Sequence, residues 1–136
     1  MSDYLIAYTD GSSKNDKGKA SNAGVAFYIP SMDILRARPI KGTNSIAELV
    51  AIDYCLWYCN EKLHVRKVHI FSDSKYAINV LSNGYKYKVN VGIIDHVKEK
   101  FKLFDDVKFS HVDGHSGIEE NEKVDKAAKE ASRRQE

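Results

Sequence analysis

The chain has 136 residues, of which 43% are hydrophobic and 29% are charged, and its formal net charge is +2. This length is typical of one domain, and the composition is that of a folded globular protein, which argues against long disordered segments. The small net charge does not by itself indicate a nucleic-acid partner. From the length we expect one domain over residues 1–136. Because the sequence contains no run of about 20 apolar residues and no secretory signal, we also expect an intracellular (cytoplasmic) protein with no membrane partner.

The first 40 residues predict three successive strands. Stretches rich in apolar, β-branched and aromatic residues at 4–9, 23–29 and 33–40 are separated by segments that contain many turn-forming residues. Strands that follow one another over such short connections favour an antiparallel meander.

The rest of the chain alternates between helical and extended patterns. Apolar residues recur at three- and four-residue spacing within 44–60, which predicts a helix with one apolar stripe. The later elements, in chain order, are a strand at 66–72, helices at 74–81 and 91–104, a strand at 106–112 and a helix at 118–134. The order predicts an α/β fold: a five-stranded mixed sheet, its first three strands antiparallel, flanked by helices.

Several residue types that often carry chemistry receive a structural interpretation. Cys55 and Cys59 lie four apart in the long apolar helix and are expected to be core thiols rather than a disulfide or half of a zinc site. Trp57, in the same helix, is expected to lie in the core. Four histidines are expected to be ordinary surface residues: His64, His69, His96 and His111.

Four acidic residues stand out by position. Asp10 and Asp73 end the first and fourth predicted strands, Glu48 lies in the first turn of the long helix, and Asp125 lies in the final helix. Ligand crevices of open α/β sheets form at the carboxyl ends of strands. Four converging carboxylates would repel one another unless a cation neutralised them, and oxygen ligands in that number select Mg²⁺ or Mn²⁺. Such a cluster suits cleavage of phosphodiesters by two metal ions.

Each of these acids also has a purely structural interpretation. The segments SIAE (45–48) and SGIE (116–119) both fit capping boxes. Asp73 could cap the helix that follows it, and Asp10, before Gly11, could be a turn residue. Spacing alone leaves both interpretations open.

Basic residues are concentrated between positions 75 and 102. This segment contains six lysines but only two acids, Asp95 and Glu99. The surface they form could follow the phosphates of a nucleic acid, or it could be an ordinary solvated face. The lysines are Lys75, Lys86, Lys88, Lys98, Lys100 and Lys102.

Four segments together resemble the type 1 ribonuclease H family: YTDGS (8–12), TNSIAEL (43–49), FSDSKYA (71–77) and GHSGIEENEKVD (114–125). They occur in the family's order and span nearly the whole chain. The resemblance implies the ribonuclease H-like fold, which agrees with the predicted mixed sheet. It also implies an endoribonuclease that hydrolyses the RNA strand of RNA–DNA hybrids, leaves 5′-phosphate and 3′-hydroxyl ends, and uses two Mg²⁺ ions, with Mn²⁺ as the alternative.

The resemblance assigns a role to each acid. Asp10 would bridge the two ions, Asp125 would complete the site of the ion that activates water, and Glu48 and Asp73 would hold the second ion. His115 matches the family's mobile histidine, which relays protons or helps the product to leave. An unperturbed imidazole titrates near pH 6.5, which suits that task.

The resemblance also implies contacts with the hybrid, whose RNA strand is distinguished by its 2′-hydroxyl groups. The residues implied for the RNA minor groove are Gly11, Ser12, Asn15, Asn44 and Lys75. Those implied for a phosphate of the DNA strand are Lys41, Thr43 and Asn90, and Asn121 would border the site. Thr43 and Asn44 could equally be ordinary residues at the start of a helix.

The chain departs from the family pattern at two places. Many members carry a basic helix and loop with a tryptophan after the fourth strand's helix, where this chain has only LSNGYKYKVNVG (81–92). Tyr85 and Tyr87, with Lys86 and Lys88, could partly replace that element by stacking and charge, or the tyrosines could pack locally. The second departure is the turn at 12–24, whose Lys14, Lys17 and Lys19 could add phosphate contacts.

The sequence thus predicts a compact, monomeric ribonuclease H. Two alternatives remain: a hybrid-binding module without catalysis, and a DNA nuclease or recombinase of the same fold. Retention of four mutually repelling carboxylates argues against the first, and the choice of cleaved strand would distinguish the second.

Overall fold

The computed structural model of the protein describes residues 3–13, 21–114 and 117–134. The strands are β1 (Leu5–Ser13), β2 (Ser21–Ile29), β3 (Ile34–Gly42), β4 (Lys67–Ser72) and β5 (Asp106–His111). The helices are η1 (Pro30–Met32), α1 (Asn44–Glu61), α2 (Lys75–Ser82), α3 (Val91–Phe101) and α4 (Glu119–Ser132). All the predicted strands and helices are present in the predicted order; the largest shift is at the end of β1, which continues to Ser13 rather than stopping at residue 9, and α3 stops at Phe101 rather than at residue 104.

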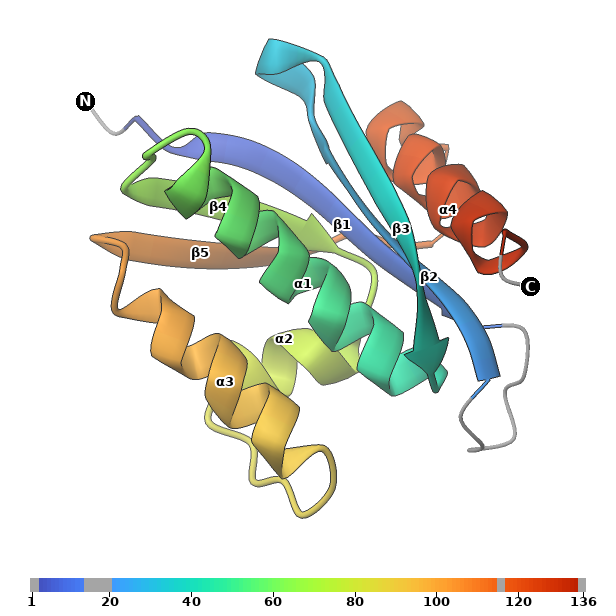
Figure 1. The fold of residues 1–136 in the computed structure, drawn as a ribbon. Helices are drawn as coiled ribbons and strands as arrows, with labels where there is room; N and C mark the ends of the chain where they lie inside the picture. Colours follow the sequence, from blue (N-terminus) through green and yellow to red (C-terminus); the bar gives the residue numbers. More distant parts are fainter. Residues whose placement is uncertain (1–2, 14–20, 115–116, 135–136) are drawn as a thin grey trace.

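The strands form one five-stranded sheet in the order β3-β2-β1-β4-β5 (Figure 1). β2 pairs antiparallel with both β1 and β3, whereas β4 pairs parallel with both β1 and β5. The prediction of a mixed sheet with an antiparallel first half is therefore confirmed. The pairing changes from antiparallel to parallel at β1, and β1 and β4 direct their carboxyl ends to the same edge of the sheet.

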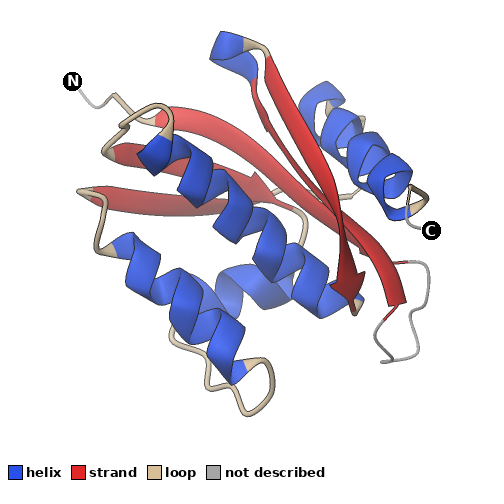
Figure 2. Cartoon of the chain, viewed as in Figure 1, coloured by secondary structure: helices blue, strands red, loops and turns tan. Residues whose placement is uncertain are grey.

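Helices cover both faces of the sheet (Figure 2). The apolar stripe of α1 packs with Phe27 and Ile70 in the main core, on the face that also carries α2 and α3. On the opposite face, Val124 and Ala128 of α4 pack with Ala26 and Tyr28 of β2. Among the residues that the structure describes, no helix combines the length and apolar character that spanning a bilayer requires.

Helix caps decide two of the open structural interpretations. Thr43 is the N-cap of α1, since its Oγ1 accepts a hydrogen bond of 3.2 Å from the backbone N–H of Ile46. The alternative interpretation of 45–48 as a capping box is therefore wrong, because the helix begins before Ser45. Ser74, not Asp73, caps α2 by accepting from the N–H of Ala77 at 3.1 Å. The second box includes Ser116, which lies outside the described residues.

Two predictions about α1 have different outcomes. Cys55 and Cys59 are fully buried, unpaired thiols, as predicted. Trp57 is 39% exposed, so the prediction that it lies in the core is wrong. The sheet covers only one side of α1, and position 57 lies off the stripe formed by Leu49, Ile52 and Leu56.

Close packing of α4 on β2 depends on Gly24. A Cβ atom at this position would lie 2.0 Å from the carbonyl oxygen of Ala128 and 2.6 Å from the nitrogen of Ser132. Gly24→Ala should therefore push α4 off the sheet and lower the free energy of unfolding by about 1–3 kcal/mol. Urea denaturation monitored by circular dichroism measures the change.

Gly92→Ala is the matched control, because a Cβ atom there would meet nothing within 4 Å and the residue lies inside α3. Alanine should raise the free energy of unfolding by about 0.5–1 kcal/mol at this position. Equal effects at the two glycines would contradict the packing argument.

Candidate metal centre

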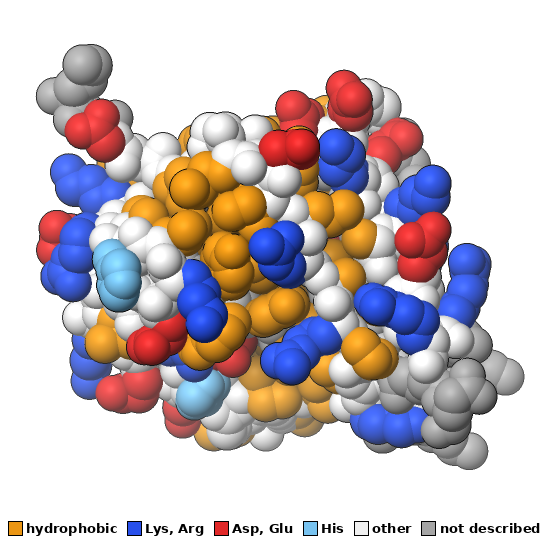
Figure 3. All heavy atoms as spheres, turned by 45° about the horizontal axis from the view of Figure 1, so that its top comes forward, with side chains coloured by type: hydrophobic (Ala, Val, Ile, Leu, Met, Phe, Trp, Pro, Cys, Tyr) orange, Lys and Arg blue, Asp and Glu red, His pale blue; other side chains and the backbone are white. Residues whose placement is uncertain are grey.

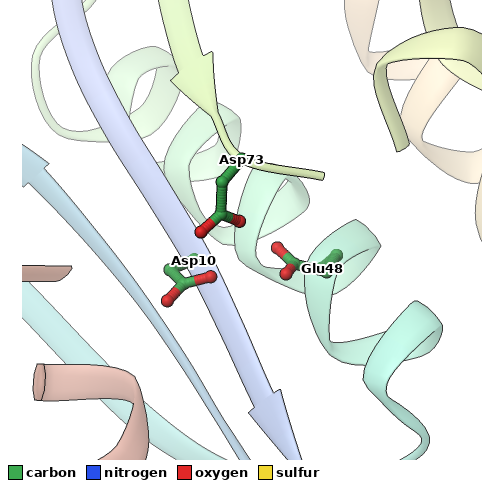
Figure 4. Close-up of side chains that lie close together, drawn as sticks. All are labelled: Asp10, Glu48 and Asp73. Atoms are coloured by element: carbon green, nitrogen blue, oxygen red, sulfur yellow. The ribbon is translucent and has the colours of Figure 1, made fainter. Parts of the chain in front are cut away.

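Three carboxylates from distant parts of the chain meet at the carboxyl edge of the parallel half of the sheet. One ligand oxygen from each of Asp10, Glu48 and Asp73 lies within 4.8 Å of the others (Figure 4). Thr9 of β1 is in register with Ser72 of β4. The next residue of each strand, Asp10 after Thr9 and Asp73 after Ser72, therefore reaches the same edge of the sheet. Glu48 comes from α1, which packs across β1.

Gly11 allows α1 to approach β1 closely enough to deliver Glu48. A Cβ atom at position 11 would lie 2.3 Å from the carbonyl carbon of Ala47 and 2.5 Å from the nitrogen of Glu48. The N–H of Gly11 donates a hydrogen bond of 3.2 Å to Oε1 of Glu48. The backbone of Gly11 therefore positions a carboxylate of the cluster, a role that its predicted contact with RNA does not include.

Burial and mutual repulsion perturb the cluster strongly. Asp10 is only 3% exposed. Its burial, followed by the charges of Glu48 and Asp73, raises the pKa of Asp10 to about 11. Burial and the charge of Asp73 raise the pKa of Glu48 to about 8, although hydrogen bonds from Asp10 and from the N–H of Gly11 act in the opposite direction. These groups cannot all be ionised at neutral pH without a compensating cation.

Asp125, the fourth predicted ligand, lies beside this group but not within it. Its Oδ2 is 3.1 Å from Nζ of Lys129, one turn later in α4. It nevertheless acts on Asp10, since a hydrogen bond and the charge of Asp125 contribute to the raised pKa of Asp10. Sequence reasoning missed Lys129, although the four-residue spacing of opposite charges on a helix was a usable signal.

The donor set fits a divalent cation. Within the described part of the chain, Oδ2 of Asp10 is buried and has no hydrogen-bond partner. Buried polar atoms are rarely left unpaired, and a carboxylate oxygen in that state beside two others suits a hard ion such as Mg²⁺ or Mn²⁺. The clustering predicted for Asp10, Glu48 and Asp73 is confirmed as geometry.

The loop before α4 also reaches the centre. A Cβ atom on Gly114 would lie 3.2 Å from Oδ2 of Asp73, so the chain passes directly against that carboxylate. Sequence reasoning included Gly114 only as the first residue of the segment 114–125 and gave it no role of its own. The predicted residues His115 and Asn15 lie outside the described residues.

The residues predicted to contact nucleic acid near α1 all have internal partners. Thr43 caps the helix, and Oδ1 of Asn44 accepts a hydrogen bond of 2.9 Å from the N–H of Ser13 in β1. Lys41 donates to Oδ1 of Asn22 on the neighbouring strand. Asn44 and Lys41 remain exposed, and Ser12 is half-buried. The side chains of Asn44 and Lys41 therefore have partners within the protein and still expose surface that a ligand can contact.

Asn90 and Lys75 lie at the starts of the next two helices. Asn90 adopts the left-handed conformation, with φ of 57°, immediately before α3, and its Nδ2 donates to the hydroxyl of Tyr76 at 3.0 Å. Lys75 is the first residue of α2 and is exposed. Asn121 differs from the expectation, because it is only 2% exposed and its Oδ1 is buried. The structure gives it no surface for direct contact with a nucleic acid.

Three of the six lysines in the basic segment interact with other side chains of the protein. Lys98 lies over the ring of Tyr87, 4.7 Å from its centroid, Lys100 pairs with Asp53, and Lys102 pairs with Glu99. Lys75, Lys86 and Lys88 are exposed. Of the two tyrosines in the short loop, Tyr87 packs against the core, whereas Tyr85 is 59% exposed.

Comparison with known sequences finds one family throughout the chain. The model of the RNase H family matches residues 2–133. Ribonuclease H1 of Homo sapiens is 27% identical over 151 residues, a match that covers 100% of this chain and 52% of the human protein. Ribonuclease H of Desulforamulus reducens is 30% identical over 143 residues, covering 95% of this chain and 87% of the relative. The chain thus spans about half the length of the human relative.

Solved structures show the same fold. RNase H1 from the halophilic archaeon Halobacterium salinarum NRC-1 superposes with a TM-score of 0.81 at 24% identity, covering 95% of this chain and 97% of the archaeal one. The N-terminal RNase H domain of a Mycobacterium tuberculosis protein gives a TM-score of 0.78 at 19% identity, covering 95% and 94%. At these identities the likeness establishes the architecture.

The raised pKa values predict how pH and metal affect stability. Without metal, the folded protein holds protons on Asp10 and Glu48 that the unfolded chain releases above about pH 4.5. The stability these protons contribute is therefore lost as pH rises toward the folded pKa values, by about 1.4 kcal/mol per pH unit for each retained proton. Thermal unfolding in a chelator should show stability falling between about pH 5 and about pH 8.

Mg²⁺ should restore stability at the upper end of this range, because it neutralises the carboxylates. Asp10→Asn should flatten the pH dependence without metal and remove most of the stabilisation by Mg²⁺. Asp33→Asn, at a left-handed position on the η1 turn that asparagine tolerates, is the control and should leave both effects intact. A metal response that survives Asp10→Asn would contradict a metal centre built on Asp10.

Proposed function

Because the chain belongs to the RNase H family, we propose that it hydrolyses the RNA strand of RNA–DNA hybrids endonucleolytically, with divalent cations as cofactors. The observation that carries this proposal is the cluster of Asp10, Glu48 and Asp73, whose ligand oxygens lie within 4.8 Å of one another. A cluster of one buried and two partly buried carboxylates is costly without a cation. Phosphodiester cleavage gives such a cluster a function.

The chain's own residues would hold the ions and fix their surroundings. Mg²⁺ or Mn²⁺ ions supply, when bound, an activated water and neutralisation of the phosphate charge. Asp10 would help to hold both ions, Glu48 and Asp73 would help to hold one of them, and Asp125 would help to hold the other. The N–H of Gly11 holds the Glu48 carboxylate in place. The expected products carry 5′-phosphate and 3′-hydroxyl ends.

The substrate surface is proposed to extend from the start of α1. Thr43 lies five residues before Glu48, about 7.5 Å along the helix axis, and the positive end of the helix dipole favours a phosphate there. Lys41 and Asn90 would assist Thr43 on the DNA strand, while Asn44 and Lys75 would face the RNA minor groove. Recognition through phosphates and 2′-hydroxyl groups implies little base preference.

Loss of one ligand tests the catalytic assignment. Asp73→Asn should reduce Mg²⁺-dependent cleavage of a hybrid to background, because one charged ligand is removed while the helix cap at Ser74 is retained. The assay labels the RNA and DNA strands separately. Asp33→Asn should cleave at the rate of the unmodified protein, and near-normal turnover by Asp73→Asn would refute the assignment.

The same assay separates the alternatives. Cleavage of duplex DNA with the hybrid's RNA spared would indicate a DNA nuclease of this fold. Tight hybrid binding without cleavage in either Mg²⁺ or Mn²⁺ would indicate a binding module.

His115 is proposed to assist proton transfer or product departure without holding an ion. His115→Ala should lower kcat by on the order of 10²-fold, the lower end of the range for general acid–base catalysis. Rates measured under single-turnover and steady-state conditions separate chemistry from product release. A loss as complete as that of Asp10→Asn would contradict the auxiliary role.

A further inference from the structure

A second surface of the molecule combines aromatic and basic side chains outside the metal centre. We define the aromatic–basic face as Tyr54, Trp57 and Tyr58 of α1, Lys62 at the end of that helix, and Arg36 and Arg38 of β3. Figure 3 views the molecule from the side of α1 and β3 and shows a broad apolar area into which Lys and Arg side chains are set. This mixture is unusual for a solvated surface, where charged groups normally separate apolar ones.

The rings and cations of this face are already ordered against one another. Trp57 lies 6.2 Å from Tyr54 and 6.3 Å from Tyr58 between ring centroids. The guanidinium of Arg36 is 5.6 Å from the centroid of Tyr58, that of Arg38 is 5.2 Å from Tyr54, and Nζ of Lys62 is 5.7 Å from Trp57. Contacts of this kind hold the cations in place, which reduces the entropy lost on binding.

Core packing explains two of the three rings but not the third. Tyr54 and Tyr58 pack on the buried Phe27, with centroids 5.0 Å and 5.2 Å away. Trp57 is 39% exposed and does not belong to the core cluster. An exposed tryptophan flanked by ordered cations is typical of an interface, where tryptophan and arginine contribute most of the binding energy.

A groove runs beside Trp57, between the helix and the edge of the sheet. Its volume is about 450 Å³, and its walls include Arg38 and Pro39 of β3, Tyr54 and Trp57 of α1, and Lys100 of α3. That volume is within the range of pockets that bury a compact apolar ligand. The groove therefore has room for one large side chain between two cations.

The charge around the groove favours an acidic partner. Within the described part of the chain, Arg36, Arg38 and Lys62 form no salt bridge. The one acid in the groove wall, Asp53, is already paired with Lys100 at 2.8 Å and lies 3.2 Å from His96. Three positive charges thus remain uncompensated, and carboxylates of a partner would complement them.

The geometry argues against two other occupants of this face, the nucleic acid that is cleaved and an added β-strand. Trp57 follows Glu48 by nine residues, or two and a half helical turns, so the face lies on the side of α1 opposite the metal centre and away from the proposed cleavage site. Pro39 lacks the N–H that an added strand would need, and it lies on β3, an edge strand of the sheet. A partner is therefore recognised by its side chains.

We propose that the aromatic–basic face docks an acidic segment of a partner protein, with one aromatic side chain of that segment in the groove beside Trp57. Carboxylates of the segment pair with Arg36, Arg38 and Lys62. This function is separate from hybrid cleavage and does not depend on it.

Fluorescence anisotropy with a labelled ten-residue probe peptide, made of glutamate and aspartate around two central phenylalanines, tests the proposal. The unmodified protein should bind this probe saturably, and a probe with alanine in place of phenylalanine should bind about tenfold more weakly. Trp57→Ala, Lys62→Glu and the double variant Arg36→Glu/Arg38→Glu should each weaken binding of the first probe by about tenfold or more.

Lys108→Glu is the matched control, because Lys108 also lies over a tyrosine ring, 4.3 Å from the centroid of Tyr4, but on β5 at the other edge of the sheet. It should change binding by less than about twofold. Circular dichroism verifies that each variant is folded, and hybrid cleavage should be unchanged in all of them. No saturable binding of the probe by the unmodified protein, or an equal loss with Lys108→Glu, overturns the proposal. A raised KM for the hybrid in the arginine variants overturns it in favour of a nucleic-acid surface.

Discussion

The repulsion between the buried carboxylate of Asp10 and the partly buried carboxylates of Glu48 and Asp73 is the constraint around which the rest of this protein is arranged. Asp10 lies almost entirely out of water, with one oxygen unpaired within the described part of the chain and with a ligand oxygen of each of Glu48 and Asp73 within 4.8 Å. At neutral pH and without a cation, the arrangement is unfavourable, because ionised carboxylates this close together repel one another. A divalent cation changes the sign of the interaction, and the same geometry then becomes a preformed coordination site.

The fold tolerates this repulsion because the acids are attached to rigid elements that are held together elsewhere. β1 and β4 pair in parallel, which brings Asp10 and Asp73 to one edge, and the apolar stripe of α1 fixes Glu48 against them. Gly11 removes the side chain that would keep helix and strand apart. The stability of the large core outweighs a local cost of a few kcal/mol, as is common at functional sites.

Sequence patterns failed where a residue's surroundings come from another element. Asp73 could be a helix cap or a ligand by its local context, and only the hydrogen bond accepted by Ser74 decided the matter. Trp57 belongs to an apolar helix, and its exposure follows from which side of α1 the sheet covers. Asn121 matched a motif position, yet packing of α4 on the sheet buries it. In each case the residue type was informative, but the neighbouring sequence did not reveal which other elements would surround the side chain.

The amino-acid sequence by itself determined the strands and helices, their order and the mixed sheet, because periodicity and turn chemistry are local properties of the chain. Through four ordered motifs it also pointed to the carboxylates and to the family. Only the tertiary structure decided that three acids separated by up to 63 positions share one site, from Asp10 to Asp73. It alone decided that Asp125 stands beside them paired with Lys129, and that Trp57 faces solvent among ordered cations. Distances between remote residues depend on how strands register and helices pack, and these are set by the whole core at once.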